Sequence, residues 1–298
     1  MDTDKHRLDK TTEHTEKENI CVNPCESVVS KIGFPESAYL HKRVPKKQFL
    51  ESGELVASDK KLFRENVKNV YWEYTLKPST CPVLPYRDNE REYLEVAVLQ
   101  VEMNYQKGHK RIAEIIHRII PYPLMIGFSF NHEEEPQMDT DEHGLKKGSI
   151  CVNLCESVVS NLFALSIAPK RFSQAEHGAF VSERFYTTGW MNSEALNDRE
   201  AAFVASLAWS HMPLQTYGTL YNAWVDRFTG YECSVLSGTF TINKEVDRLE
   251  RLTRCREIES RISELRGQLK KSAFNRQVEL NTQIKQMERE LAEMVVKL

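Results

Sequence analysis

Two clusters of basic side chains could bind phosphate groups. The first is His41-Lys42-Arg43-Val44-Pro45-Lys46-Lys47, and the second is Lys107-Gly108-His109-Lys110-Arg111. Charge would act in both, and backbone amides at a helix start would add to the second. The alternative is an ordinary solvated surface. The residues predicted to contact nucleic acid are Lys42, Arg43, Lys46, Lys47, Lys107, Lys110 and Arg111.

Aromatic side chains near these clusters could stack on bases, although core packing is the usual fate of aromatic residues on strands. They are Tyr39, Tyr71, Trp72 and Tyr105.

Catalytic patterns are weak in this chain. The strings G-x-S-x-G, G-x-x-x-x-G-K-[ST], G-x-G-x-x-G and H-E-x-x-H do not occur. Glu95 and Glu102 with Lys107 resemble part of a metal-dependent nuclease, since paired acids and a lysine hold Mg²⁺ and a scissile phosphate. Their odd spacing places the acids on opposite faces of a regular strand, unless a bulge brings them together. The sequence therefore assigns no catalytic residue and favours a role other than catalysis.

A repeated segment explains four of the seven cysteines. Residues 20–30 (ICVNPCESVVS) recur as residues 150–160 (ICVNLCESVVS) with one change. The pairs Cys21/Cys25 and Cys151/Cys155 could hold zinc, but metal binding does not require identical neighbours such as Glu-Ser-Val-Val. We interpret both copies as insertions of a dispersed repeat. No metal or cofactor is expected, and an odd number of cysteines fits reduced thiols.

The elements that would position the basic clusters predict an α+β fold. Loop and helices are expected over residues 34–68, and a helix over 108–120. Apolar or alternating runs predict strands at 70–76, 93–103, 123–130, 161–168 and 184–191. Removing residues 131–160 would make the third and fourth strands a hairpin. This order favours a mostly antiparallel sheet with helices covering one face.

The C-terminal residues 244–298 carry apolar side chains at the alternating 3-4 spacing of a coiled-coil seam. The phase slips between Leu269 and Leu280, which favours an antiparallel helical hairpin over one kinked rod. Acid-then-base pairs four residues apart are expected at 247/251, 250/254 and 257/261. The predicted assembly seam consists of Ile258, Ile262, Leu265, Ile284, Met287 and Leu291.

Four segments follow from these patterns. Residues 1–33 are expected to be a disordered, repeat-derived extension, and residues 34–193 an α+β domain interrupted by the inserted loop 131–160. Residues 194–243 are expected to be a helical connector, with Gly230–Thr241 as a link, before the coiled coil.

Charge and hydropathy limit the possible binding partners and the possible cellular location of the protein. The 40 basic and 43 acidic side chains nearly cancel, so only local patches can attract nucleic acid. A bilayer-spanning apolar run and the apolar core of a signal peptide are both absent. The expected location is the cytoplasm, without membrane contact.

Several short strings occur in an order that resembles a known family. They are RVPKK at 43–47, YWEY at 71–74, IIPYP at 119–123, FYTTGW at 185–190 and FNRQVELN at 274–281. Over roughly residues 34–298 the chain is similar to the uncharacterised bacterial domain-of-unknown-function family 4391. The resemblance implies gene neighbourhoods with helicases and DNA methyltransferases, as in restriction or anti-phage defence islands, and implies no catalytic residues.

We therefore expect an accessory or scaffold subunit of a DNA-processing defence system. It would bind a helicase or methyltransferase partner, contact nucleic acid through the basic clusters, and self-associate through the coiled coil. Two alternatives remain open: a divergent metal-dependent nuclease using Glu95 or Glu102, and a purely structural self-associating protein with a seam but no basic face.

Overall fold

A seven-stranded sheet forms the centre of the body in a computed structural model, which describes residues 28–53, 55–132, 160–175, 178–242 and 247–298. Neighbouring strands follow the order β1-β2-β5-β6-β7-β10, and β11 also pairs with β7. All of these pairs are antiparallel except β5 with β6, so the predicted α+β class is confirmed. The strands are β1 (Tyr39–Arg43), β2 (Val67–Leu76), β5 (Val96–Met103), β6 (Leu124–His132), β7 (Ser160–Ile167), β10 (Tyr186–Thr187) and β11 (Met191–Asn192).

The parallel pair exists because α4 (His109–Ile119) carries the chain from the end of β5 back to the start of β6. Its buried face holds Ile112, Ile115 and Ile116, which are the residues whose spacing predicted this helix. The helix begins after Gly108, whose φ of 92° lies in the left-handed region that favours glycine. The predicted boundaries therefore differ from the observed ones by one residue at each end.

β6 and β7 form the predicted hairpin. Their register runs from Met125↔Ile167 to His132↔Ser160, so the pairing continues to the edges of the predicted insertion. The repeat copy between them lies almost wholly in residues 133–159, outside the described residues.

Replacing residues 133–159 by a four-residue turn should leave the thermal midpoint of the body within about 2 °C of the parent, because loop closure entropy changes slowly with length. Differential scanning calorimetry measures this midpoint. A fall of several degrees would show that the segment packs on the body.

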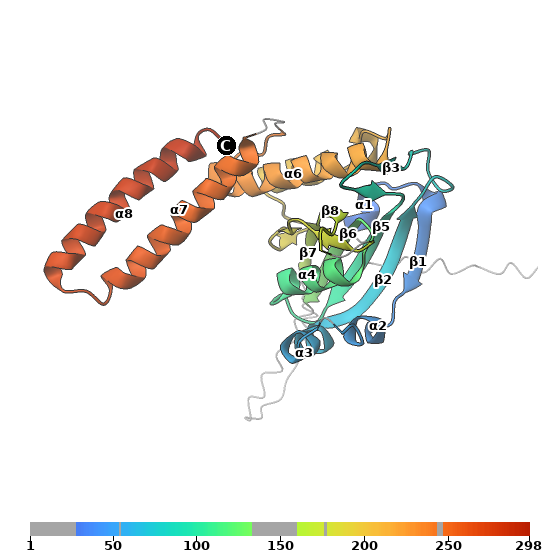
Figure 1. Cartoon of the computed structure of the whole chain (residues 1–298), viewed down its shortest axis with the longest axis horizontal. Helices are drawn as coiled ribbons and strands as arrows, with labels where there is room; N and C mark the ends of the chain where they lie inside the picture. The colour runs from blue at the N-terminus through green and yellow to red at the C-terminus, as the bar shows by residue number, and fades with distance from the viewer. Residues whose placement is uncertain (1–27, 54, 133–159, 176–177, 243–246) are drawn as a thin grey trace, which may run out of the picture.

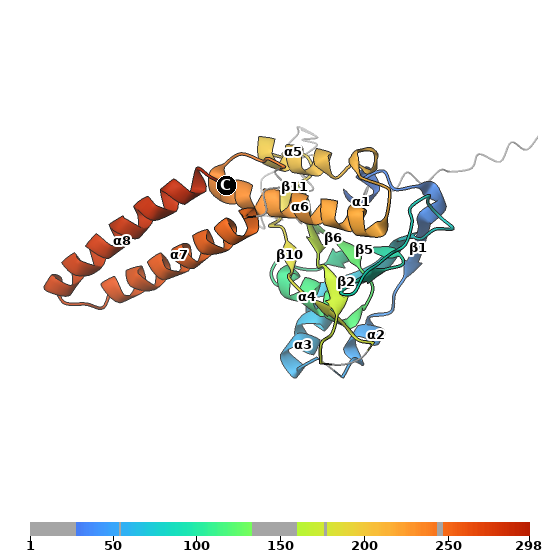
Figure 2. The same ribbon diagram turned by 45° about the horizontal axis from the view of Figure 1, so that its top comes forward.

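Helices cover both faces of the sheet, which corrects the expectation of one covered face (Figures 1 and 2). One face packs against α2 (Lys46–Leu50), α3 (Ala57–Asn66) and α4. The other packs against α1 (Val28–Lys31), α5 (Asp198–Ser206) and α6 (Tyr217–Ser237). Short elements complete the body: β3 (Tyr86–Arg87), β4 (Glu92–Tyr93), β8 (Lys170–Phe172), β9 (Phe180–Ser182) and the 3₁₀ turns Glu36–Ala38 and Trp209–His211.

Residues 194–243, which were predicted to be a connector, largely belong to the hydrophobic core on this second face of the sheet. Tyr221, Trp224 and Phe228 of α6 are buried against the sheet. The helix also continues through Gly230, where a link was expected. A Cβ at Gly230 would lie 2.6 Å from the backbone oxygen of Thr241, so glycine is required by close approach of the following segment, not by a turn.

The last residues of the first repeat copy also belong to the body. Val29 is fully buried and Ile32 is 3% exposed, so the prediction that residues 1–33 lie outside the fold is wrong from residue 28 onward. A Cβ at Gly127 of β6 would lie 2.3 Å from Cγ2 of Val29 and 2.7 Å from Oε1 of Gln100. Glycine in the middle of the sheet therefore makes room for α1.

The C-terminal segment forms a helical hairpin, as predicted (Figure 1). Its helices are α7 (Arg248–Leu269) and α8 (Phe274–Val295), which pack along each other and project from the body beyond α6. The ion pairs that the structure shows within α7 and within α8 are three residues apart with the base first, whereas the predicted pairs were four residues apart with the acid first. The observed pairs are Arg254–Glu257, Arg256–Glu259, Arg261–Glu264 and Arg276–Glu279.

The root of the hairpin is held by Arg248, which is 2% exposed. Its guanidinium donates to the backbone oxygen of Thr241 at 2.7 Å and to its Oγ1 at 2.8 Å.

Among the helices of the described part of the chain, none has the length and hydropathy needed to cross a membrane.

Candidate nucleic-acid interface

The first basic cluster lies on β1 and α2, and its members have different environments. Lys42 and Arg43 are exposed on the edge strand. Lys46 instead donates its ammonium to the backbone oxygen of Val67 at 2.7 Å and to that of Arg64 at 3.4 Å, so it stabilises the end of α3. Lys47 lies 3.4 Å from Glu51 in an exposed ion pair, which contributes little stability.

The second cluster surrounds the start of α4, and only part of it is available to a ligand. Lys107 and Lys110 are exposed. Arg111 binds Asp59 through two hydrogen bonds of 2.7 and 3.0 Å and also binds Glu114 at 2.7 Å. The hydrogen bond from Arg111 lowers the pKa of Asp59, and the bond to Asp59 in turn raises the pKa of Arg111. Arg111 therefore ties α4 to α3 and is not available to phosphate.

The two clusters meet on either side of the α3–β2 junction. On one side Lys46 bonds to carbonyl groups of that junction. On the other, the Asn66 side chain donates to the backbone oxygen of Lys107 at 2.5 Å. Residues separated by some 60 positions thus come to one end of the sheet, opposite α6 in Figures 1 and 2.

Two further cations lie at this junction and were not predicted: Arg64, in the last turn of α3, and Lys68, in the second position of β2. Both are exposed. Tyr105, in the turn before α4, is 61% exposed and adds an aromatic face. Sequence clustering could not identify these cations, because each is isolated in the sequence and only the fold brings it close to the others. We call Arg64, Lys68, Lys107 and Lys110 the basic end.

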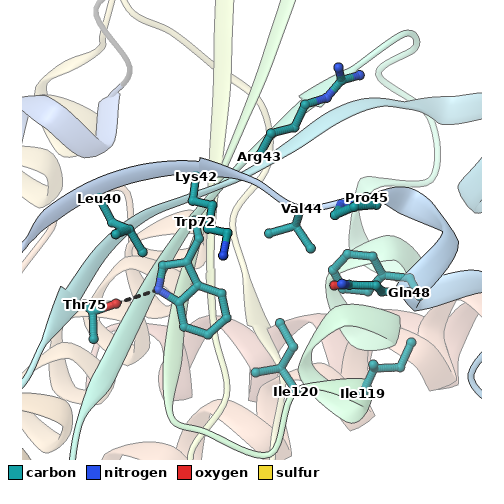
Figure 3. Close-up of a pocket in the computed structure, with 11 residues that line it drawn as sticks. Leu40, Lys42, Arg43, Val44, Pro45, Gln48, Trp72, Thr75, Ile119 and Ile120 are labelled. Atoms are coloured by element: carbon teal, nitrogen blue, oxygen red, sulfur yellow. Dashed lines mark hydrogen bonds between the residues drawn. The ribbon is translucent and has the colours of Figure 1, made fainter.

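A cavity of about 410 Å³ lies beside the basic end, between β1, β2, α2 and the last turn of α4 (Figure 3). Trp72 and Thr75 come from β2, and the indole N–H donates to Thr75 Oγ1 at 2.8 Å. Lys42 extends toward the indole, whereas Arg43 points away (Figure 3). The remaining lining residues are Leu40, Val44, Pro45, Gln48, Phe49, Ile119 and Ile120.

Arg43 belongs to a polar network on the other face of the sheet. Its guanidinium donates to Asn69 Oδ1 at 2.8 Å, and Asn69 Nδ2 donates to Glu102 Oε2 at 2.6 Å. These bonds cross β1, β2 and β5. Glu102 therefore accepts a hydrogen bond at the end of a chain of polar groups, and Arg43 has a structural partner that a phosphate would have to displace.

His41 lies beside this network in a bulge of β1. Its φ of 43° is unusual for a residue other than glycine. The ring stacks on Tyr71 with centroids 4.9 Å apart, and Nδ1 lies 3.0 Å from Glu73 Oε1. The stacking and the carboxylate together hold the strained backbone in place.

The nuclease alternative receives no support from the arrangement of its acids. Glu95 precedes β5 and contributes charge near Tyr217, whereas Glu102 lies at the opposite end of that strand. The backbone positions of the two residues are seven apart along an extended chain, a separation of about 23 Å. The described residues contain no group of three or more acidic, His or Cys side chains placed to bind a metal ion.

Cys21, Cys25, Cys151 and Cys155, which would form the alternative zinc site, lie outside the described residues. The other three cysteines, Cys81, Cys233 and Cys255, are free and buried. Burial raises the pKa of both Cys233 and Cys255, which makes these thiols poor nucleophiles.

The predicted assembly seam lies inside the hairpin. Ile258, Ile262, Leu265 and Ile284 are 3–6% exposed, and Met287 and Leu291 pack against them. These six residues therefore hold α7 to α8 within one chain, and the four buried ones offer no surface to another chain. The exposed apolar side chains near the hairpin tip are Phe274, 77% exposed, and Val278, 53% exposed.

Comparison with known proteins gives one match. A family model described as Domain of unknown function (DUF4391) matches residues 32–291. No curated protein and no solved structure shows significant similarity to the chain.

Proposed function

The chain belongs to the DUF4391 family of unknown function, and from that premise we propose that it is a non-catalytic accessory subunit of a bacterial DNA-processing system. The body would bind nucleic acid through the basic end, and the hairpin would hold a protein partner. A helicase or a DNA methyltransferase in a restriction or anti-phage defence system fits this role.

The observation that carries the nucleic-acid part is the basic end at the α3–β2 junction, which contains two cations of the second cluster and two cations of the junction itself. These four exposed cations have no ion-pair partner among the described residues. Phosphates attract such a group through release of condensed counterions. The junction also carries the exposed ring of Tyr105, which could stack on a base.

Replacing all four residues of the basic end by alanine should weaken binding to duplex and single-stranded DNA and flatten its salt dependence. Each lost phosphate contact lowers the slope of log affinity against log salt by about 0.9 for duplex DNA, so the slope should fall by up to about 3.6. Fluorescence anisotropy at several salt concentrations measures both quantities.

The matched control carries the same charge change on the hairpin, at Lys270, Lys271, Lys285 and Lys297, all of which are exposed. This variant should bind DNA as the parent does. If the two variants lose affinity equally, net charge and not the basic end governs binding, and the proposed interface is wrong.

The partner-binding part is supported by the shape of the hairpin. Its seam is buried internally, yet it projects from the body with Phe274 and Val278 exposed near the tip (Figure 1). Such a projecting pair of helices has no role in the core of the body. A purely structural protein that self-associates through the same tip is the second candidate, and sedimentation velocity distinguishes it by a concentration-dependent dimer.

A further inference from the structure

The cavity beside β1 has the size and walls of a ligand site. Its volume of about 410 Å³ falls within the range of about 300–1,000 Å³ found for small-molecule pockets. Apolar walls come from β1, from α2 and from the last turn of α4, with Leu40, Phe49 and Ile119 as examples. An apolar body of modest size would therefore be desolvated on entry.

The charge of the cavity selects against cations. Lys42 extends into it beside Trp72 (Figure 3), and these two residues are direct partners across β1 and β2. None of the side chains that line the cavity is acidic. A ligand that combines an apolar body with a negative group matches this arrangement.

The orientation of Trp72 favours a flat ligand. The hydrogen bond from its indole N–H to Thr75 Oγ1 joins two side chains of the same strand and fixes the plane of the ring. A ring that is already fixed loses little conformational entropy when another ring stacks on it. Nucleobases are flat, and stacking on aromatic side chains tolerates any base.

The edge of the sheet is unsuited to the other common ligand, an extended peptide. A peptide would add as a strand to β1, which lies at the edge of the sheet. The bulge at His41 distorts that edge, Lys42 places a charge on it, and Pro45 follows directly after Val44. Bulges, lysine and proline are the devices that protect edge strands from pairing.

The cavity is also close to the basic end. α2 connects them, because Lys46 at its start bonds to the α3–β2 junction while Gln48 and Phe49 line the cavity. This helix has five residues and spans about 7.5 Å. A strand bound by its phosphates at the basic end would therefore have to extend only a short way to reach the mouth of the cavity.

We propose that this cavity binds an unpaired base of single-stranded nucleic acid, stacked on Trp72, with Lys42 contacting an adjacent phosphate. The inference rests on the proposed function and specifies its ligand. In this proposal the basic end binds the phosphate backbone of single-stranded and duplex nucleic acid alike. The cavity distinguishes single strands from duplexes.

The test compares a thymidine 12-mer with a 12-mer of abasic sites, which has the same phosphates and no bases. The full-length protein should bind the thymidine 12-mer at least about tenfold more tightly, the lower part of the range for one stacked base. Trp72→Leu should remove this preference and leave binding of the abasic 12-mer unchanged. Lys42→Met should weaken binding of both.

Leu40→Trp provides a second variant from a residue that is 52% exposed, so folding is not at risk. The new indole should fill the mouth of the cavity and abolish the preference, as Trp72→Leu does. Circular dichroism checks that both variants are folded.

The outcomes separate the two proposals. Equal affinity for the two 12-mers, or a preference that survives both Trp72→Leu and Leu40→Trp, overturns the cavity assignment while the basic end retains its role. Absence of binding to either 12-mer and to duplex DNA overturns the proposed function and this inference together. Trp72-dependent binding of a glutamate-rich peptide without binding of the 12-mers assigns the cavity to a protein partner.

Discussion

Replacing Ile262 and Ile284 by aspartate should unfold the hairpin of α7 and α8 while the body remains folded. The two side chains lie on different helices of one seam and are 5% and 6% exposed. Buried carboxylates without partners cost several kcal/mol each, more than a two-helix unit can supply from its own seam. The two helices contain 22 residues each, so the far-ultraviolet helical signal should fall strongly.

The four tryptophans provide an independent readout, because all of them precede α7. Near-ultraviolet circular dichroism of the body should therefore keep its parental spectrum. Val278→Asp is the matched control, since this side chain is 53% exposed on the same hairpin. Loss of the tryptophan signal in the double variant would show that the hairpin and the body fold as one cooperative unit.

Replacing Lys170 by alanine should destabilise the body by about 3–5 kcal/mol, through a lost buried side chain and unsatisfied acceptors. The residue is 2% exposed, on β8. Its ammonium donates to the backbone oxygens of His117 and Ile120, near the end of α4, and to Ser182 Oγ on β9. One buried cation thus joins three elements and caps a helix at its negative end.

Urea unfolding monitored by tryptophan fluorescence measures this loss. Lys77→Ala, at an exposed position in the turn after β2, should change stability by less than about 0.5 kcal/mol. Lys170→Met keeps most of the volume and lacks the ammonium, so it should fall between the two. A Lys170→Ala variant as stable as the parent would show that water replaces the ammonium at no cost.

Burial also lowers the pKa of Lys170, from an ordinary 10.5 to about 8. Between these values the unfolded chain holds a proton that the folded chain has released, so stability rises with pH. Measured against Lys170→Met, the parent should therefore gain stability from about pH 8 to pH 10. The gain ends near pH 10.5, because above the ordinary pKa of lysine the unfolded chain has released this proton as well.

The sequence predicts those elements whose burial leaves a clear pattern of apolar residues. The isoleucines of α4 have helical spacing because one side of that helix is buried, whereas β6 and β7 are continuous apolar runs because both of their faces are buried. β1 gives no such signal, since all five of its residues are exposed and it pairs on one side only. An edge strand whose residues are all exposed cannot be recognised from hydropathy.

Long-range contacts account for the other differences. Arg111 looks like a phosphate ligand until α3 brings Asp59, 52 positions earlier, to within 2.7 Å. Gly230 looks like a helix terminator, but it lies in the middle of α6 because the chain returns past it at Thr241. The cavity is lined by segments that lie between residues 40 and 120, so no local sequence pattern could predict it.

The attachment of the hairpin allows α7 and α8 to act as a lever. The lever would pivot at the contact of Arg248 with Thr241, and α7, whose 22 residues extend about 33 Å, sets its length. A tilt of about 10° at this pivot would move the tip by about 6 Å over that length. A small rearrangement of the packing between α6 and the start of α7 would therefore cause a larger displacement of a partner bound at Phe274.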